Sequence, residues 1–244
     1  MAVKDFICKT IRKRAMHVTL LDPDPKKMEG IDEKIKQLKQ FGTDAFLVGG
    51  STNVNQVFLD KLVLKIKNTS LPVILFPGGL SGISKYADAI FFMSLLNSKD
   101  PYWITGAQAQ ASVLVKKLGI EIIPMAYLIV EPGMRVGEVG KADLIKRDEC
   151  IKAAQYALAA QHLGMSLVYL EAGSGAPEPV PTEMVKAIKK TIDIPLIVGG
   201  GIRKPVQAKA LLEAGADIID TGTITEENFT AIKSIIEIVK NYKK

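Results

Sequence analysis

The sequence has few cysteines and no long apolar run. Its 244 residues include only two cysteines, Cys8 and Cys150, which lie far apart and match no metal or redox spacing. No apolar run is long enough to cross a bilayer, and residues 1–14 lack the apolar segment and cleavage site of a signal peptide. We therefore exclude a disulfide scaffold and an integral membrane protein. We expect a cytoplasmic protein with at most peripheral membrane contact.

Aromatic residues are also scarce, at 6% of the chain, and the formal net charge is +6. A nucleic-acid-binding surface needs clustered basic residues with aromatics between them. Here the lysines are spread over predicted helix faces such as "EKIKQLKQ" and "EMVKAIKK". This distribution argues against a nucleic-acid partner, whereas a modest positive field suits a small anionic substrate.

Apolar, β-branched runs recur at regular intervals along the chain. There are eight, at 15–22, 45–50, 71–76, 89–93, 120–131, 166–172, 195–200 and 217–222. Most are separated by amphipathic helical patterns, and this alternation is typical of a parallel sheet buried on both faces. Eight such units predict a single (β/α)8 TIM-barrel domain over residues 1–244, with an open doubly wound sheet as the weaker alternative.

The third unit departs from this pattern. Only residues 77–88, "PGGLSGISKYAD", separate the third run from the fourth, and they contain three glycines and a proline. Both residue types disfavour a helix. We therefore expect an irregular segment in place of the third helix. The resulting gap in the outer ring would suit an insertion, a partner subunit or an elongated apolar ligand.

Glycines end the seventh and eighth runs. The chain reads Gly199-Gly200-Gly201 at the end of one and Thr221-Gly222-Thr223 at the end of the other. Loops at these two positions form the usual phosphate site of such barrels, because bare backbone N–H groups there face the ligand. Either tripeptide alone would also fit a plain tight turn. Together they predict phosphate binding.

The sixth run ends in "YLEAGSGA", residues 169–176. Tyr169 and Glu171 alternate with Leu170, so their side chains point to the same face. The loop Gly173-Ser174-Gly175 can add hydrogen-bond donors to the same anion. Glu171 has three possible roles: an ion pair in the barrel mouth, a ligand for substrate hydroxyls, or a general base.

Across the mouth, hard oxygen ligands end the first and second runs. Asp22 is the last residue of the first run, and Ser51 directly follows the second. Mg²⁺ takes one or two protein groups of this type and completes its shell from substrate phosphates. Asp24 is better explained as a helix cap. The mouth would then hold one bare phosphate and one metal-bound phosphate, which indicates two phosphorylated substrates.

The other candidates for catalytic residues have weaker support in the sequence. His17 and His162 fit packing or surface positions better than catalysis. The fifth and sixth runs contain no lysine, which argues against a Schiff-base aldolase, and no histidine ends the fourth run to pair with Glu171 in an isomerase. Another phosphosugar enzyme and a non-catalytic phosphate or prenyl-lipid binder remain the alternatives.

Several longer segments resemble the geranylgeranylglyceryl phosphate synthase family, which includes the heptaprenylglyceryl phosphate synthases. They are "LLDPD", "DAFLVGGSTN", "VILFPGGLSGIS", "ADAIFFMSLLNSKDPYWITGAQ", "AYLIVEPG", "YLEAGSGAPEPVP", "PLIVGGGIR" and "ADIIDTGT". The block "LLNSKDPYWI" is the most specific of them and places the chain with the family's second subgroup. The family has a modified barrel in which an irregular segment replaces the third helix.

The resemblance implies transfer of a geranylgeranyl group from its diphosphate to the 3-hydroxyl of sn-glycerol 1-phosphate, the first ether-bond step of archaeal membrane lipids. Transfer of another prenyl length, such as heptaprenyl, is the alternative. The resemblance also implies a homo-oligomer and a prenyl tail lying in the groove left by the missing helix. Some members carry a lysine two residues before the metal-binding aspartate, where this chain has Leu20. Arg203 or a lysine elsewhere would then assist the diphosphate.

The family's site residues transfer to this chain by motif. Asp22 and Ser51 would hold Mg²⁺, and Glu171, with Tyr169, would be catalytic. The residues implied to bind glycerol phosphate are Tyr169, Leu170, Glu171, Ala172, Gly173, Ser174, Gly175, Gly200, Gly201, Gly222 and Thr223.

Overall fold

Eight parallel strands close into a barrel in the computed structural model, which describes residues 2–50 and 54–243. The strands are β1 (Met16–Leu21), β2 (Ala45–Val48), β3 (Val73–Leu75), β4 (Ala89–Leu95), β5 (Glu121–Ile129), β6 (Leu167–Glu171), β7 (Leu196–Gly199) and β8 (Ile218–Thr221). Each pairs in parallel with its neighbours in sequence, and β8 pairs with β1. The predicted (β/α)8 barrel is confirmed, and the open sheet is wrong.

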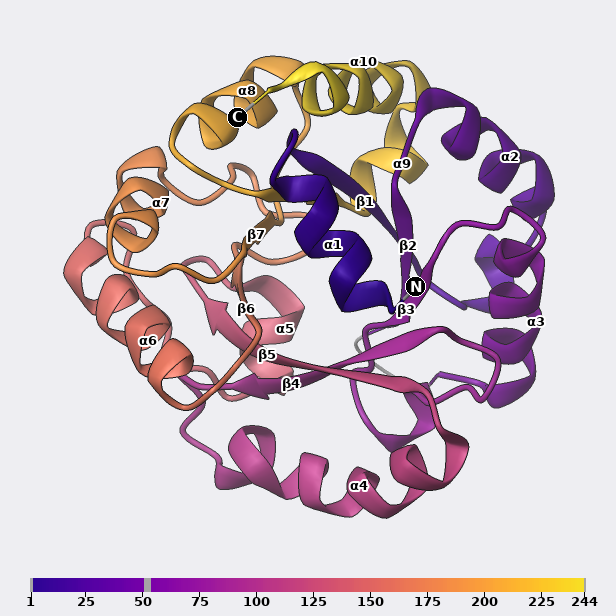
Figure 1. The fold of residues 1–244 in the computed structure, drawn as a ribbon, viewed down its shortest axis with the longest axis horizontal. Helices are drawn as coiled ribbons and strands as arrows, with labels where there is room; N and C mark the ends of the chain where they lie inside the picture. Colours follow the sequence, from indigo (N-terminus) through magenta and orange to yellow (C-terminus); the bar gives the residue numbers. More distant parts are fainter. Residues whose placement is uncertain (1, 51–53, 244) are drawn as a thin grey trace.

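Helices form a ring around the barrel (Figure 1). They are α2 (Ile31–Phe41), α3 (Gln56–Lys67), α4 (Ala107–Leu118), α6 (Cys150–His162), α7 (Thr182–Lys189), α8 (Pro205–Glu213) and α10 (Phe229–Asn241). Two short helices, α5 (Met134–Val139) and α9 (Thr223–Glu227), lie in the loops after β5 and β8. Among the described residues, no helix is long and apolar enough to span a bilayer.

The third βα unit lacks a regular helix, as predicted. Between β3 and β4 the structure has only the single 3₁₀ turn η2 (Leu80–Gly82). The ring in Figure 1 therefore passes from α3, which follows β2, to α4, which follows β4. Before α4 the chain forms a short π-helical turn, η3 (Tyr102–Gly106).

An additional helix, α1 (Val3–Ile11), lies across the centre of the barrel (Figure 1). Val3 and Ile7 are buried in the same apolar cluster as the barrel interior. The backbone N–H of Lys4 donates to the Glu121 carboxylate at 2.9 Å, at the first residue of β5. Because α1 closes the N-terminal end of the strands, the open mouth lies at their C-terminal end, where such barrels carry out chemistry.

Side chains alternate between two apolar layers along each strand. On β6, Leu167 and Tyr169 belong to the barrel interior, whereas Val168 and Leu170 pack against the helices. The same alternation directs Glu171 to the inside of the barrel at the mouth. Strand parity, readable from the sequence, therefore decides which residues reach the site.

Candidate functional site

A polar cavity of about 400 Å³ opens where β6, β7 and β8 end. Seven of the predicted glycerol-phosphate residues line it: Glu171, Ser174, Gly175, Gly200, Gly201, Gly222 and Thr223. They come from three loops separated by about twenty to thirty residues in sequence, so the closed barrel brings them together. Ser174 Oγ and Thr223 Oγ1 are 2.9 Å apart and join the loops of β6 and β8.

Backbone rather than side chain forms most of this cavity. Gly173, Gly175, Gly200 and Gly201 have φ of +103°, +80°, +79° and +70°, a region that L-residues with side chains rarely adopt. A Cβ on Gly200 would also stand 2.3 Å from Glu171 Oε1. The glycines therefore allow loops and carboxylate to approach closely. The Gly173 N–H donates to Glu171, whereas the N–H groups of Gly175, Gly200 and Gly201 can face an anion.

Glu171 lies at the inner edge of the cavity, with only 6% of its surface exposed. The Gly173 N–H donates to its Oε1 at 2.6 Å, and the Tyr127 hydroxyl donates to its Oε2 at 3.1 Å. Burial raises the pKa of Glu171, and these hydrogen bonds oppose the rise. A fixed, buried carboxyl of raised pKa is suited to accept a proton from a substrate hydroxyl.

The remaining predicted residues of this segment lie behind the cavity wall. Tyr169 is fully buried inside the barrel, and its hydroxyl donates to Asp220 Oδ2 at 2.6 Å. Leu170 and Ala172 pack in the outer apolar layer, so only their backbones face the mouth. Gly173 gives its N–H to Glu171. Their predicted contacts with glycerol phosphate remain predictions.

Sequence reasoning missed two residues of this site, Tyr127 and Asp220. Burial, followed by the Glu171 charge and hydrogen bond, raises the pKa of Tyr127 well above its ordinary value. Asp220 lines the polar cavity and is 3% exposed. The signal for Asp220 was present, since it alternates with Ile218 on β8 and so faces inward. Tyr127 became recognisable only when the structure placed β5 beside β6.

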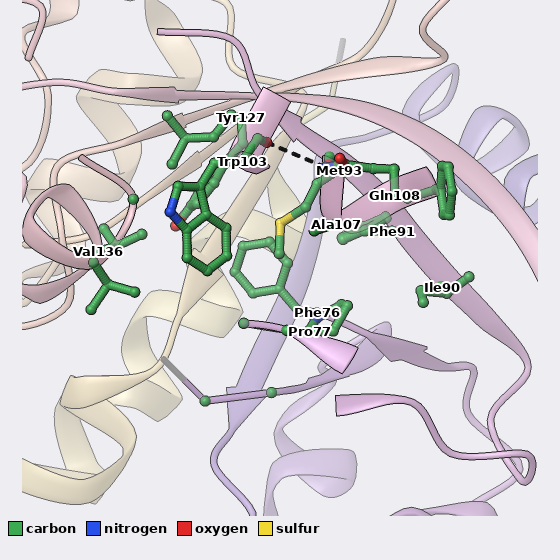
Figure 2. Close-up of a pocket in the computed structure, with 18 of the residues that line it drawn as sticks. Phe76, Pro77, Ile90, Phe91, Met93, Trp103, Ala107, Gln108, Tyr127 and Val136 are labelled. Atoms are coloured by element: carbon green, nitrogen blue, oxygen red, sulfur yellow. Dashed lines mark hydrogen bonds between the residues drawn. The ribbon is translucent and has the colours of Figure 1, made fainter. Parts of the chain in front are cut away.

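A second, larger and mostly apolar cavity of about 1140 Å³ lies beside the first, between β3, β4, α4 and α5. Figure 2 shows Phe76, Met93 and Trp103 around this space. Trp103 stands edge-on to Tyr102, with ring centroids 5.0 Å apart. The cavity lies beside the third unit, where the regular helix is missing. This is the gap for which the sequence left an insertion, a partner subunit or an elongated apolar ligand as occupants.

The two cavities meet. Leu20, Glu171 and Ser174 line both of them. An apolar chain in the larger cavity and a small anion in the polar one would therefore both reach the Glu171 carboxylate. This shared edge is where two substrates could react.

Asp22 stands at the rim, with 38% of its side chain exposed. It lies next to Gly50, which lines the apolar cavity. A Cβ on Gly50 would lie 2.8 Å from Asp22 Oδ1. Partial burial raises the pKa of Asp22, and the nearby Lys27 ammonium opposes that rise. Ser51, the other predicted ligand, lies outside the described residues.

The donor set at this rim fits a magnesium ion. Within residues 2–50 and 54–243, no three His, Cys, Asp or Glu side chains gather into a metal site. A single carboxylate is compatible with Mg²⁺, which keeps water and substrate phosphate in its shell. Asp24 instead accepts the Lys26 N–H at 2.9 Å and caps the turn η1 (Pro25–Lys27), which confirms the expected cap.

Lys27 and Arg203 are two of the cations that the described residues place around the mouth. Lys27 Nζ lies 3.5 Å from Asp22 Oδ2 and 2.9 Å from Glu226 Oε1 of α9. Arg203 lines the polar cavity, and its guanidinium donates to the carbonyl oxygen of Gly175 at 3.3 Å. Lys27 is thus placed beside the rim carboxylate, whereas Arg203 supports the glycine loop of β6.

The two histidines fit the packing interpretation. His17 is fully buried on the outer side of β1, where its ring nitrogens contact the hydroxyls of Thr43 and Thr221, each at 3.0 Å. Burial lowers the pKa of His17 to about 4, so the ring is neutral at physiological pH. His162 lies in the last turn of α6.

Comparison with known proteins identifies the family. Residues 8–240, nearly the whole chain, match the model of the PcrB family. The chain belongs to this family. A geranylgeranylglyceryl phosphate synthase of Pyrococcus horikoshii is 54% identical over 242 residues, which is 98% of this chain and 95% of the relative. A synthase of the same name from Thermococcus kodakarensis is 57% identical over 226 residues, 92% of this chain and 90% of that one.

Solved structures within the PcrB family share the fold in detail. Wild-type GGGPS from Thermoplasma volcanium matches with a TM-score of 0.95 and 45% identity, covering 100% of both chains. The (S)-3-O-geranylgeranylglyceryl phosphate synthase of Thermoplasma acidophilum, solved in complex with its substrate sn-glycerol-1-phosphate, matches with a TM-score of 0.94 and 46% identity. That match covers 98% of this chain and 99% of the other. The resemblance seen in the sequence motifs is confirmed.

Proposed function

We propose that this PcrB-family chain is a prenyltransferase. It joins geranylgeranyl diphosphate to the 3-hydroxyl of sn-glycerol 1-phosphate, forms an ether bond and releases diphosphate. The observation that carries the proposal is the pair of cavities meeting at Glu171, one apolar and one lined by glycine backbone. The names of relatives more than 50% identical to the chain support the same reaction.

Glycerol phosphate would occupy the polar cavity. Backbone N–H groups around Gly200, Gly201 and Gly222 would surround its phosphate, and the Ser174 and Thr223 hydroxyls would add donors. Binding by its own phosphate would hold the 3-hydroxyl near Glu171, and such positioning supplies a large part of a bimolecular rate.

Glu171 is the proposed base. As the glycerol oxygen forms its bond to C1 of the prenyl group, the bond from C1 to the diphosphate oxygen breaks, and its electron pair leaves with the diphosphate. The hydroxyl proton passes to a Glu171 carboxylate oxygen. The Gly173 N–H and the Tyr127 hydroxyl hold that carboxylate in place.

The diphosphate would lie at the rim. Asp22 and Ser51 would hold Mg²⁺ there, and the ion would neutralise the charge that develops on the leaving group. Lys27 forms an ion pair with Asp22. Some family members use a lysine at the position of Leu20 to assist the diphosphate, and we assign that role to Lys27 in this chain.

The prenyl tail would lie in the apolar cavity. Burial of each methylene contributes about 0.8 kcal/mol, so the length of the cavity can select the length of the chain. Exclusion of water from this space would also protect the allylic cation from hydrolysis.

Purified protein incubated with Mg²⁺, labelled sn-glycerol 1-phosphate and one prenyl diphosphate at a time tests the proposal. We expect a labelled prenyl ether with geranylgeranyl diphosphate, and less product with shorter or longer donors. Product with heptaprenyl diphosphate alone would favour the alternative chain length. Turnover of a sugar phosphate without any prenyl donor would overturn the prenyltransferase assignment.

A homo-oligomer and a cytoplasmic location remain predictions from the family resemblance. Sedimentation velocity of the purified chain measures the first, and fractionation of the native cells measures the second.

A further inference from the structure

Two buried carboxyl groups lie inside the barrel just below the mouth, close enough for the charge of one to raise the pKa of the other. Glu171 ends β6, and Asp220 lies on β8, with 6% and 3% of their surfaces exposed. Two buried tyrosines, Tyr127 and Tyr169, lie beside them, with ring centroids 5.2 Å apart. The proposed function uses only Glu171, so the role of Asp220 needs an explanation.

The two carboxyls differ in their hydrogen bonds. Glu171 accepts from the Gly173 N–H on one oxygen and from the Tyr127 hydroxyl on the other. Asp220 accepts from the Tyr169 hydroxyl on Oδ2, while its Oδ1 is buried without a hydrogen-bond partner among the described residues. A buried carboxylate with an unpartnered oxygen destabilises the fold through lost solvation, and a neutral carboxyl in the same place does so much less. The ionised form is therefore better supported at Glu171 than at Asp220.

The two groups also oppose each other's charge. Burial raises the pKa of Asp220 and the Glu171 charge raises it further, whereas the Tyr169 hydroxyl and the nearby backbone N–H groups of Thr221 and Leu20 lower it. The balance leaves the pKa of Asp220 at about 7. The Tyr169 hydroxyl, which lies close enough to lower the pKa of Glu171 as well, has a single hydrogen to donate. Ionising both carboxyl groups around this one hydroxyl at neutral pH would cost free energy, because their negative charges repel each other.

Few other titratable groups face this pair. Tyr127 on β5 and Tyr169 on β6 are the tyrosines beside it, and both have pKa values raised by burial. Gly199 of β7 adjoins the Tyr169 hydroxyl and carries no side chain, and Leu20 of β1 contributes only its backbone N–H, which lowers the pKa of Asp220. On the cavity side, Arg203 is directed to the carbonyl oxygens of the β6 loop.

His17 lies on the far side of β1, turned outward, and is neutral.

We propose that Asp220 is a positioning residue that holds the single proton shared with Glu171, so that Glu171 is ionised and ready to accept the hydroxyl proton of glycerol phosphate. This inference rests on the proposed function. During transfer the proton from the glycerol oxygen goes to Glu171, which leaves both carboxyls protonated until one proton returns to solvent. A neutral Asp220 also places no negative charge in the wall of the phosphate cavity.

The Asp220→Asn variant tests this assignment, because asparagine resembles the neutral carboxyl in shape. We expect the acidic limb of kcat/KM to stay at the same pH as in wild type, since Glu171 has an uncharged neighbour in both proteins. The KM of wild type for glycerol phosphate should rise above pH ~7, as Asp220 ionises, by at least about threefold relative to the variant. The ratio of the two KM values cancels titration of the substrate phosphate.

Calorimetry gives a second readout. At pH ~8, in buffers of different ionisation enthalpy, wild type should take up close to one proton on binding glycerol phosphate, and D220N close to none. A matched control is Asp217→Asn. Asp217 is an equally buried carboxyl just before β8 that pairs with Lys189 at 2.7 Å, far from the mouth. In Asp217→Asn, the KM for glycerol phosphate should depend on pH as it does in wild type.

Thermal melting without substrate separates this inference from the proposed function. The unfolded Asp220 has a pKa near 3.8 and the folded one about 7, so wild type loses stability as the pH rises through that window. D220N lacks this loss, and its Tm relative to wild type should increase from pH ~4 to ~7. A flat difference in Tm would overturn the inference even if prenyl transfer is confirmed.

An acidic limb that moves to lower pH in D220N would also overturn the inference, because it would show that Asp220 was the ionised partner. If D220N does not fold, Tyr169→Phe replaces it. Loss of the Tyr169 hydrogen bond to Asp220 should raise the pKa of Asp220 and move the rise in KM to higher pH, and a rise at unchanged pH would contradict the assignment.

Discussion

The two cavities at the barrel mouth are built from different parts of the chain. The polar cavity is made by glycine backbone and hydroxyls at the ends of three strands, and its shape depends on φ values that only glycine adopts readily. The apolar cavity is made largely by large side chains, among them Phe76 just after β3, Met93 on β4 and Trp103 in the turn η3. Backbone defines one site and side-chain volume the other.

This difference predicts how each cavity responds to change. A backbone cradle has few tolerated substitutions, because any Cβ occupies the ligand's space or forces a strained conformation. An apolar wall tolerates substitution and changes its length preference by small steps. Glu171 belongs to both cavities and should be the most sensitive position of all.

Glu171→Gln gives the largest expected effect, since it removes the base at the shared edge of the two cavities. We expect kcat to fall by about 10²–10⁴-fold, with glycerol phosphate still bound, because the amide keeps the size of the carboxyl. Steady-state kinetics and calorimetry measure the two quantities. Glu178→Gln, an exposed change in the same loop, should retain wild-type rates. Wild-type kcat in E171Q would remove Glu171 from the mechanism.

Asp22→Asn acts on the diphosphate side alone. Loss of the rim carboxylate should reduce diphosphate release by about 10²–10³-fold and leave glycerol phosphate binding nearly intact. The control is Asp24→Asn, because asparagine caps the turn η1 as well as aspartate does. Full activity of D22N in excess chelator would refute the metal site.

Gly200→Ala and Gly175→Ala separate space from backbone strain in the polar cavity. Both glycines have φ near +80°, so alanine should cost roughly 1–2 kcal/mol of stability at each. Only at Gly200 would the new Cβ meet Glu171, whereas Gly175 has nothing within 4 Å. We expect a loss of kcat/KM of up to about 10²-fold for G200A and little loss for G175A. Equal losses of kcat/KM in the two variants would show that backbone strain, and not contact of the new Cβ with Glu171, causes the loss.

Ala107→Leu gives the smallest expected effect, in the apolar cavity. Ala107 lines that cavity from α4, and leucine would displace one or two methylenes of the prenyl chain. At about 0.8 kcal/mol each, the KM for geranylgeranyl diphosphate should rise about 4- to 15-fold, with the KM for glycerol phosphate unchanged. Ala109→Leu, exposed on the same helix, serves as the control. A rise in both KM values would indicate a general disturbance of the mouth.

The barrel itself was predictable from the chain. Each of the eight apolar runs became one strand, because a strand buried on both faces needs a continuous apolar segment. The irregular third unit was also predictable, since the glycines and proline of 77–88 cannot support a helix. The glycine loops near Gly175, Gly200 and Gly222 were also predictable, because their glycines stand at the ends of apolar runs in the sequence.

Helix α1 was not predicted to close the barrel. Its amphipathic pattern is an ordinary one, and where Val3 and Ile7 pack depends on an opening that exists only after eight strands have closed. Tyr127 and Asp220 were missed as site residues for a related reason. Their hydroxyl and carboxyl meet partners 44 and 51 residues away in sequence, so no local pattern connects them.

The sequence alone determined the strands, the helices of the outer ring, the missing third helix and the glycines at the strand ends, because these follow from local periodicity and backbone freedom. The tertiary structure decided which carboxyl stands beside which hydroxyl, that the apolar and polar cavities share the Glu171 edge, and which charges are buried together. Those properties depend on desolvation and on distances of a few ångströms between strands, and only the closed barrel sets them.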